Sequence, residues 1–191
     1  MNSLNMLKIF YSKILNPLLK FFFGLFFNKR YLQGKYFENN FLGWKWVFRS
    51  FFTQKILGIN RRVNWPVSTK IAIDYPKGIH FHPDDLNNFQ HFGCYFSNTN
   101  GGNITIGKGT WIAPNVGLIT TNHKLDNLNH HDKPNDIVIG LNCWLGMNSI
   151  ILPGIHLGDK TIVGAGSVVT KSFPEGNCVI VGNPAKCIKN F

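Results

Sequence analysis

The histidine in the stretch LITTNHKLDN (residues 118–127) is the strongest candidate for chemistry in this sequence. A neutral imidazole can remove a proton from an alcohol as a general base, which typically accelerates a reaction by about 10² to 10⁴. His123 stands where a regular aliphatic pattern stops and a polar segment begins, so we expect its side chain to face outward beside a loop. The position predicts a catalytic general base. Asp126 is either its orienting partner or a turn residue.

Other residues with reactive side chains give weaker signals. His130 and His131 are adjacent, and residues 80–82 read His-Phe-His, but no three-histidine metal arrangement follows from their spacing. We expect solvated loop histidines and no metal. The cysteines form no CxxC pair and no dense framework, which favours reduced, buried thiols and no activated nucleophile. They are Cys94, Cys143, Cys178 and Cys187. We therefore expect one substrate to attack the other directly in a ternary complex, without a covalent intermediate on the protein.

The elements that must position His123 are set by a repeat of six residues. A strict period of six fits neither a helix nor a meander of alternating strands. It fits a triangular coil in which each hexapeptide makes one short strand and one corner, with parallel ladders between coils and aliphatic columns inside. The sequence therefore predicts a parallel β-helix. The leading aliphatic residues are Ile106, Ile112 and Leu118, followed after an interruption by Ile139, Leu145, Ile151, Leu157, Val163 and Val169.

The chain divides by composition into two expected domains. Residues 61–191 carry the repeat, with an extruded loop at 124–136. Residues 1–60 hold nine Lys or Arg, a single acid (Glu38) and eleven of the seventeen phenylalanines, so most of the net charge of +11 lies there. The sequence predicts a helical segment here.

A basic segment rich in phenylalanine suits an anionic membrane surface better than a nucleic acid, and we expect no nucleic-acid partner. The longest apolar run, residues 18–27, is too short to span a bilayer and contains Lys20. Residues 1–60 therefore either contact a membrane peripherally or pack on the protein's own oligomer. We expect the protein in the cytoplasm, either free or on the inner face of the plasma membrane.

The C-terminal sequence WLGMNSIILPGIHLGDKTIVGAGSVVTKSFPEGNCVIVGNPAKCIK (144–189) resembles the signature of the hexapeptide-repeat acyltransferases. Within that superfamily the chain is similar to bacterial polysaccharide and sugar O-acetyltransferases, through VNWPVSTKI (63–71), GCYFSNTN (93–100), residues 104–123 and residues 133–146. The resemblance implies a left-handed β-helix, a homotrimer with active sites between subunits, and His123 as the catalytic histidine. It covers residues 63–191, so the first sixty residues lie outside it.

The resemblance also implies acetyl-CoA as the acyl donor. Family members hold the donor with residues that match Met147 and Ala165, and place Lys or Arg where this chain has Lys171, Lys186 and Lys189. Trp144, at a position where relatives also carry tryptophan, either walls the acyl pocket or covers the prism.

The acceptor is the least determined part of the expected site. Where galactoside-type enzymes carry a substrate-contacting asparagine this chain has Tyr95, and Asn98, Asn100 or Asn103 could replace it. Ser68 stands where relatives often have histidine. We expect O-acetylation of a sugar hydroxyl in a bacterial surface polysaccharide or its precursor. N-acetylation of an amino-sugar or small molecule, or a metal-binding β-helix without transferase activity, remain alternatives.

Overall fold

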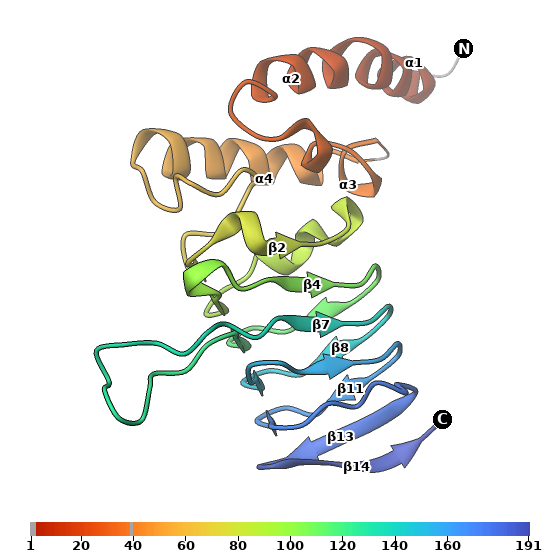
Figure 1. The fold of residues 1–191 in the computed structure, drawn as a ribbon. Helices are drawn as coiled ribbons and strands as arrows, with labels where there is room; N and C mark the ends of the chain where they lie inside the picture. Colours follow the sequence, from red (N-terminus) through yellow and green to blue (C-terminus); the bar gives the residue numbers. More distant parts are fainter. Residues whose placement is uncertain (1–2, 39) are drawn as a thin grey trace. The chain divides into compact units, whose positions relative to one another are not determined.

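The computed structural model describes residues 3–38 and 40–191, which form a helical unit ending at Thr69 and a β-helical unit spanning Lys70–Phe191 (Figure 1). Residues 61–69, expected at the start of the β domain, pack with the helices. The amide of Gln54 explains this, because it donates to the carbonyls of Val63 and Trp65 (both 3.2 Å) and accepts from the N–H of Val67 (3.0 Å).

The helical unit has an aromatic core of its own. Phe37 and Trp44 are fully buried, and their rings meet edge to face with centroids 5.1 Å apart. The indole of Trp44 donates to the buried Asn16 amide at 3.1 Å. No helix among the described residues is both long and apolar enough to cross a membrane. The helices are α1 (Ser3–Phe10), α2 (Asn16–Phe23), α3 (Lys35–Glu38) and α4 (Leu42–Ser50), with a 3₁₀ turn at Lys29–Tyr31 and π-helical turns at Tyr11–Leu15 and Phe51–Ile56.

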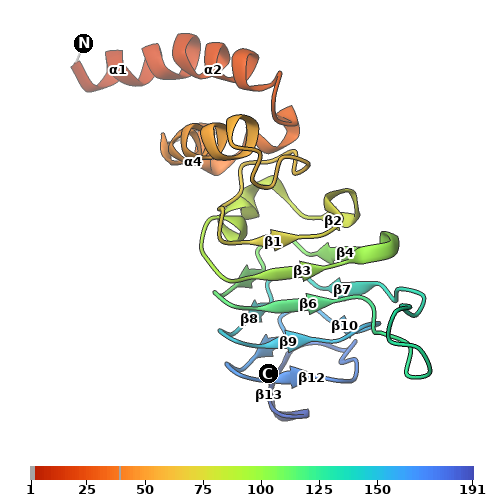
Figure 2. The ribbon, with the colours of Figure 1, turned by 90° about the vertical axis from the view of Figure 1, so that its left-hand side faces the viewer.

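The β-helical unit consists of three sheets whose strands pair in parallel from coil to coil (Figures 1 and 2). The first sheet is β1 (Ala72–Ile73), β3 (Tyr95–Ser97), β6 (Gly117–Ile119), β9 (Ile150–Ile151) and β12 (Val168–Val169). The second is β2 (Ile79–His80), β4 (Ile104–Ile106), β7 (Ile137–Ile139) and β10 (His156–Leu157). The third is β5 (Trp111–Ile112), β8 (Trp144–Leu145), β11 (Ile162–Val163), β13 (Cys178–Gly182) and the antiparallel β14 (Ala185–Asn190).

The repeat predicted from the sequence forms the interior of this unit. All nine leading aliphatic residues are at most 3% exposed. They stack in register: Leu118 pairs with Ile151 across β6 and β9, and Leu145 with Val163 across β8 and β11. The predicted fold class, a left-handed parallel β-helix of hexapeptide repeats with a helical N-terminal extension, is confirmed.

The corners between strands require left-handed backbone. Asn115, Asn142 and Asn148 take φ values of 60°, 54° and 60°, a conformation that asparagine tolerates better than other residues with a β-carbon. Short 3₁₀ turns precede the regular coils at Pro76–Gly78, Pro83–Phe89 and Thr99–Gly101. Consecutive strands from β1 to β13 thus lie in different sheets, and each corner can carry an outward side chain.

Candidate active site

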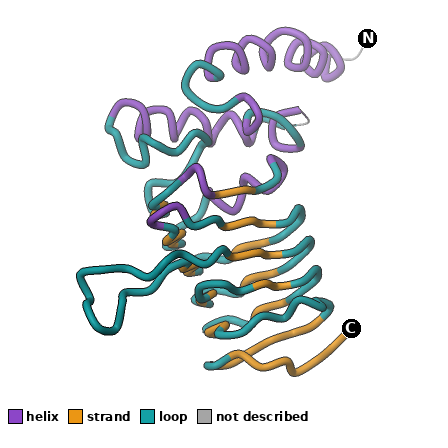
Figure 3. Tube along the Cα trace, in the orientation of Figure 1, coloured by secondary structure: helices purple, strands orange, loops and turns teal. Residues whose placement is uncertain are grey.

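The loop at 124–136 leaves the prism at the corner between β6 and β7 and folds back as a narrow ribbon (Figure 3). Its two arms are joined by backbone hydrogen bonds: Asp132 donates to the Asn122 carbonyl and Lys124 to the His130 carbonyl, each at 2.9 Å. The arms pair in this way, so the loop holds a defined shape while it projects away from the prism (Figure 3).

The end of the loop is attached to the neighbouring coil by Asp136. Its two carboxylate oxygens accept from the backbone N–H of Asn103 at 2.8 Å and from the Asn103 amide at 3.0 Å. The N–H of Asn135 donates to the Thr120 carbonyl at 2.8 Å. Both the start and the end of the loop are therefore fixed at the same corner.

His123 is exposed on the first arm of the loop, and its orientation is set by a backbone group. Its Nδ1 lies 2.6 Å from the carbonyl oxygen of Leu128. A carbonyl only accepts, so Nδ1 carries the proton and the neutral ring keeps its lone pair on Nε2. The Leu128 carbonyl, rather than the Asp126 carboxylate, is the group that meets this nitrogen. Sequence reasoning missed this partner because it is a main-chain atom.

A second histidine accompanies His123. The rings of His123 and His131 have centroids 4.2 Å apart and are inclined at 37°, and the two residues form an isolated antiparallel bridge. Within residues 3–38 and 40–191, no cluster of three or more His, Cys, Asp or Glu is arranged to hold a metal ion.

Of the four candidates for acceptor contact, Asn103 is bonded to Asp136, and the other three differ in position. Tyr95 is 43% exposed on β3, in the same sheet as β6, and its hydroxyl donates to Asp74 at 2.9 Å. Asn100 is exposed in the turn between β3 and β4, at the corner one coil before that of His123. Tyr95 therefore lies on the sheet whose strand β6 leads to His123, and Asn100 lies at the equivalent corner one coil earlier.

Asn98 does not fit the predicted role. It is fully buried, and its side-chain oxygen accepts from the N–H of Tyr75 at 2.9 Å. Its amide donates to the carbonyls of Tyr75 (2.7 Å) and Gly102 (3.0 Å). The geometry gives Asn98 a structural role, since its polar atoms are used on the backbone and none is left for a sugar.

The residues predicted to bind the donor are all exposed, but a single chain distributes them over the prism. Met147 and Ala165 lie at stacked corners between the third and first sheets, where the N–H of Gly166 donates to the Met147 carbonyl at 2.8 Å. Trp144, Lys186 and Lys189 belong to the third sheet, while Lys171 follows β12. One chain therefore does not gather these side chains and His123 on one face.

The cysteines carry no sign of nucleophilic activation. All four are free thiols, and Cys94, Cys143 and Cys178 are buried, whereas Cys187 is exposed. Burial raises the pKa of the Cys94 thiol from 9.0 to about 11, and burial also raises the pKa values of Cys143 and Cys178. A thiol held protonated in this way is a poor nucleophile.

A prism of stacked hexapeptides with an oriented histidine at a loop corner defines a class of β-helical protein, and comparisons with known proteins identify the same class. The family model "Hexapeptide repeat of succinyl-transferase" matches residues 136–171. The putative lipopolysaccharide biosynthesis O-acetyl transferase WbbJ of Escherichia coli is 34% identical over 148 residues, which cover 70% of this chain and 72% of the relative. The chain belongs to the hexapeptide-repeat acyltransferase family.

Two solved structures are similar in fold and sequence. A galactoside acetyltransferase in complex with coenzyme A is 32% identical with a TM-score of 0.57, covering 66% of this chain and 61% of its own. A maltose O-acetyltransferase from Clostridium difficile is 36% identical with a TM-score of 0.52, covering 63% of each chain. With several other curated relatives the chain spans about half of the relative's length, from 44% to 59%.

Proposed function

We propose that the protein is an acetyl-CoA-dependent O-acetyltransferase that acts on a sugar hydroxyl of a bacterial surface polysaccharide or its precursor. The relatives named for lipopolysaccharide biosynthesis, galactoside and maltose O-acetylation support the sugar acceptor. The observation that carries the proposal is the 2.6 Å contact between His123 Nδ1 and the Leu128 carbonyl, which leaves Nε2 as an exposed proton acceptor.

In the proposed reaction, His123 Nε2 takes the proton of the acceptor hydroxyl as its oxygen attacks the thioester carbonyl carbon. The C–S bond then breaks, and the imidazolium returns the proton to the departing thiolate, giving an acetyl ester and a free thiol. The Leu128 carbonyl stabilises the ring while it carries positive charge, because the Nδ1–H bond to it strengthens on protonation. The base is regenerated, and the chain forms no covalent bond to the acyl group.

The exposed residues of the coils fit an extended acyl donor. Met147 and Ala165 present adjacent corners, where a chain of amide groups can lie along the stacked turns. The ammonium groups of Lys171, Lys186 and Lys189 are exposed towards the C-terminal end, as phosphate binding requires.

We further propose that the working form is a homotrimer in which a neighbouring copy completes each site. His123 and Trp144 lie on different parts of one prism, so a site that uses both needs two chains. Exposed apolar side chains support such a contact. Trp111 and Trp144 pair in register on the third sheet and are 58% and 54% exposed, and Leu125 at the loop is 99% exposed.

The acceptor side of the proposed site consists of Tyr95 and Asn100 beside His123. Both present polar groups to the outside of the prism in the coil that precedes His123, Tyr95 from β3 and Asn100 from the turn after it. A location in the cytoplasm, free or on the inner face of the plasma membrane, agrees with an acceptor that is assembled there before export.

The test is thiol release from acetyl-CoA by the full-length protein against a panel of sugars and glycan precursors, comparing His123→Ala with His130→Ala. His130 is an exposed histidine of the same loop. We expect acceptor-dependent release to fall by about 10² to 10⁴ in His123→Ala and to stay unchanged in His130→Ala.

Equal loss in both variants, or full activity of His123→Ala, would refute the assignment of the base. The product distinguishes the alternatives, since an O-acetyl ester is cleaved by mild alkali whereas an N-acetyl amide is not. Bound metal together with no thiol release from any acceptor would favour a β-helix without transferase activity.

A further inference from the structure

The outer side of the first helices carries a stripe of large apolar side chains that nothing in the helical unit covers. Its members are Phe10, Ile14, Leu18, Phe21 and Leu25, between 51% and 70% exposed. They recur three or four residues apart, which places the first four on one side of the helix, and Leu25 follows in the turn after α2. Asn16 and Phe23, seven residues apart, occupy the opposite side and are buried in the unit.

The π-helical turn at Tyr11–Leu15 joins α1 to α2 without breaking the helix. In it the N–H of Asn16 donates to the Tyr11 carbonyl, five residues earlier. Pro17 follows at once, and its ring would clash with the carbonyl four residues before it in a regular α-helix. The wider turn accommodates the proline, so the outer stripe continues from α1 into α2.

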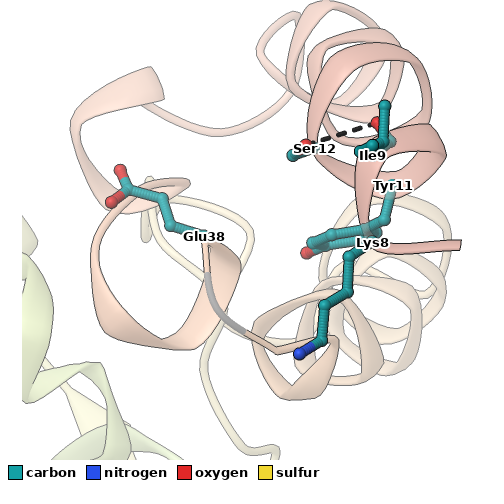
Figure 4. A pocket seen from close by; sticks show the side chains of 5 residues that line it. All are labelled: Lys8, Ile9, Tyr11, Ser12 and Glu38. Carbon is teal, nitrogen blue, oxygen red and sulfur yellow. Dashed lines mark hydrogen bonds between the residues drawn. The ribbon is translucent and has the colours of Figure 1, made fainter. Parts of the chain in front are cut away.

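Polar groups attach the first half of this helix to the unit, whereas Phe23 of α2 packs against the rings of Trp44, Phe48 and Phe51. Tyr11 donates its hydroxyl proton to the carbonyls of Phe37 and Asn40, the latter at 3.0 Å. A hollow with a mixed polar and apolar lining is formed by Lys8, Ile9, Tyr11, Ser12 and Glu38 (Figure 4). The unit thus holds one side of the helix through Tyr11, Asn16 and Phe23, and the apolar stripe is left on the other side.

Cations accompany the stripe. Lys13 lies at the rim of an apolar hollow lined by Met6, Ile9, Phe10 and Ile14, and Lys20 is only partly buried further along. The first sixty residues contain nine Lys or Arg against a single acid, Glu38. Two copies meeting at this stripe would bring like charges together with almost no carboxylates to offset them.

We propose that this stripe docks the protein on an anionic phospholipid bilayer, with the helix lying in the plane of the interface. Apolar side chains enter the acyl region, the hollow beside Lys13 accepts part of an acyl chain, and the lysines pair with lipid phosphates. This inference does not depend on the proposed acetyl transfer, because it rests only on the helical unit. Docking would hold the enzyme beside acceptors that are attached to the membrane.

The test is flotation of the full-length protein with vesicles of phosphatidylcholine, with and without phosphatidylglycerol. The stripe variant is Leu18→Asp/Phe21→Asp, and the charge variant is Lys13→Gln/Lys20→Gln. The control is Ile56→Asp/Leu57→Asp, which alters two apolar residues of the same unit that are 60% and 57% exposed but lie off the stripe. Circular dichroism checks that each variant is folded.

We expect the wild type to float only with anionic vesicles, and less so at high salt. The stripe variant should lose about tenfold in partitioning for each residue changed. The charge variant should lose about fivefold for each lysine, and the control should match the wild type.

Unchanged flotation of the stripe variant would overturn the proposal, as would equal binding to vesicles of phosphatidylcholine alone. A control variant that loses as much as the stripe variant would show that the stripe is not the docking surface. If light scattering without vesicles shows that the stripe variant dissociates the oligomer, the stripe covers a second copy of the chain instead of lipid.

Discussion

Replacing Asn98 by alanine separates a structural from a substrate-binding role for this residue. The substitution removes the Asn98 partner of two backbone groups, the N–H of Tyr75 and the carbonyl of Gly102, at a residue that is 0% exposed. The Tyr75 carbonyl loses one of its two donors and keeps the N–H of Gly78. A buried polar group that loses its partner costs about 1–3 kcal/mol, and local rearrangement recovers part of that. We expect a loss of about 3 kcal/mol in the free energy of unfolding. For a chain of this length that corresponds to a fall in Tm of about 6–12 °C.

Differential scanning calorimetry and acceptor titration together make the assay. The matched control is Asn100→Gly, which removes an exposed amide two residues away, and glycine adopts the φ of 58° at that position without strain. We expect Asn100→Gly to keep the melting temperature and to raise KM for the acceptor. A melting temperature of Asn98→Ala equal to that of the wild type, with a raised acceptor KM, would refute the structural assignment.

Two further predictions concern the packing and the thiols of the β-helix. Gly107→Ala should cost about 1–3 kcal/mol in urea unfolding, because its β-carbon would lie 2.3 Å from the Gly140 carbonyl oxygen of the next coil. Gly117→Ala, whose β-carbon would meet nothing nearer than 3.8 Å, should leave stability unchanged or raise it by about 0.4–1 kcal/mol, and equal losses in the two would contradict the packing. Because burial raises the pKa of Cys94 from 9.0 to about 11, the folded state binds more protons than the unfolded state between these values. Its contribution is therefore present below pH 9 and is lost as the pH rises towards 11. Denaturation at alkaline pH should show a smaller pH dependence in Cys94→Ala, and an identical slope in both proteins would disprove it.

The interior of the β-helix could be predicted from the sequence because it depends on one residue in six. Ile106, Leu145 and Val169 are buried as their spacing requires, and each satisfies the pattern independently of the others. Asn98 could not be placed by the same reasoning. Its burial depends on how the turn Thr99–Gly101 brings the Gly102 carbonyl back towards Tyr75, and that backbone path has no period in the sequence.

The orientation of the His123 ring could not be predicted from side-chain types for a related reason, although the sequence contains one local signal for it. The partner of His123 is a carbonyl, which every residue possesses, so side-chain types alone could not identify it and left Asp126 open as either a partner or a turn residue. The signal is Asn127, whose side chain accepts from the N–H of Asn129 at 3.0 Å while its carbonyl accepts from His130 at 3.0 Å. This turn reverses the loop and presents the Leu128 carbonyl to the imidazole. The repeat therefore fixes where the histidine leaves the prism, and the turn within the loop fixes which of its nitrogens can act as a base.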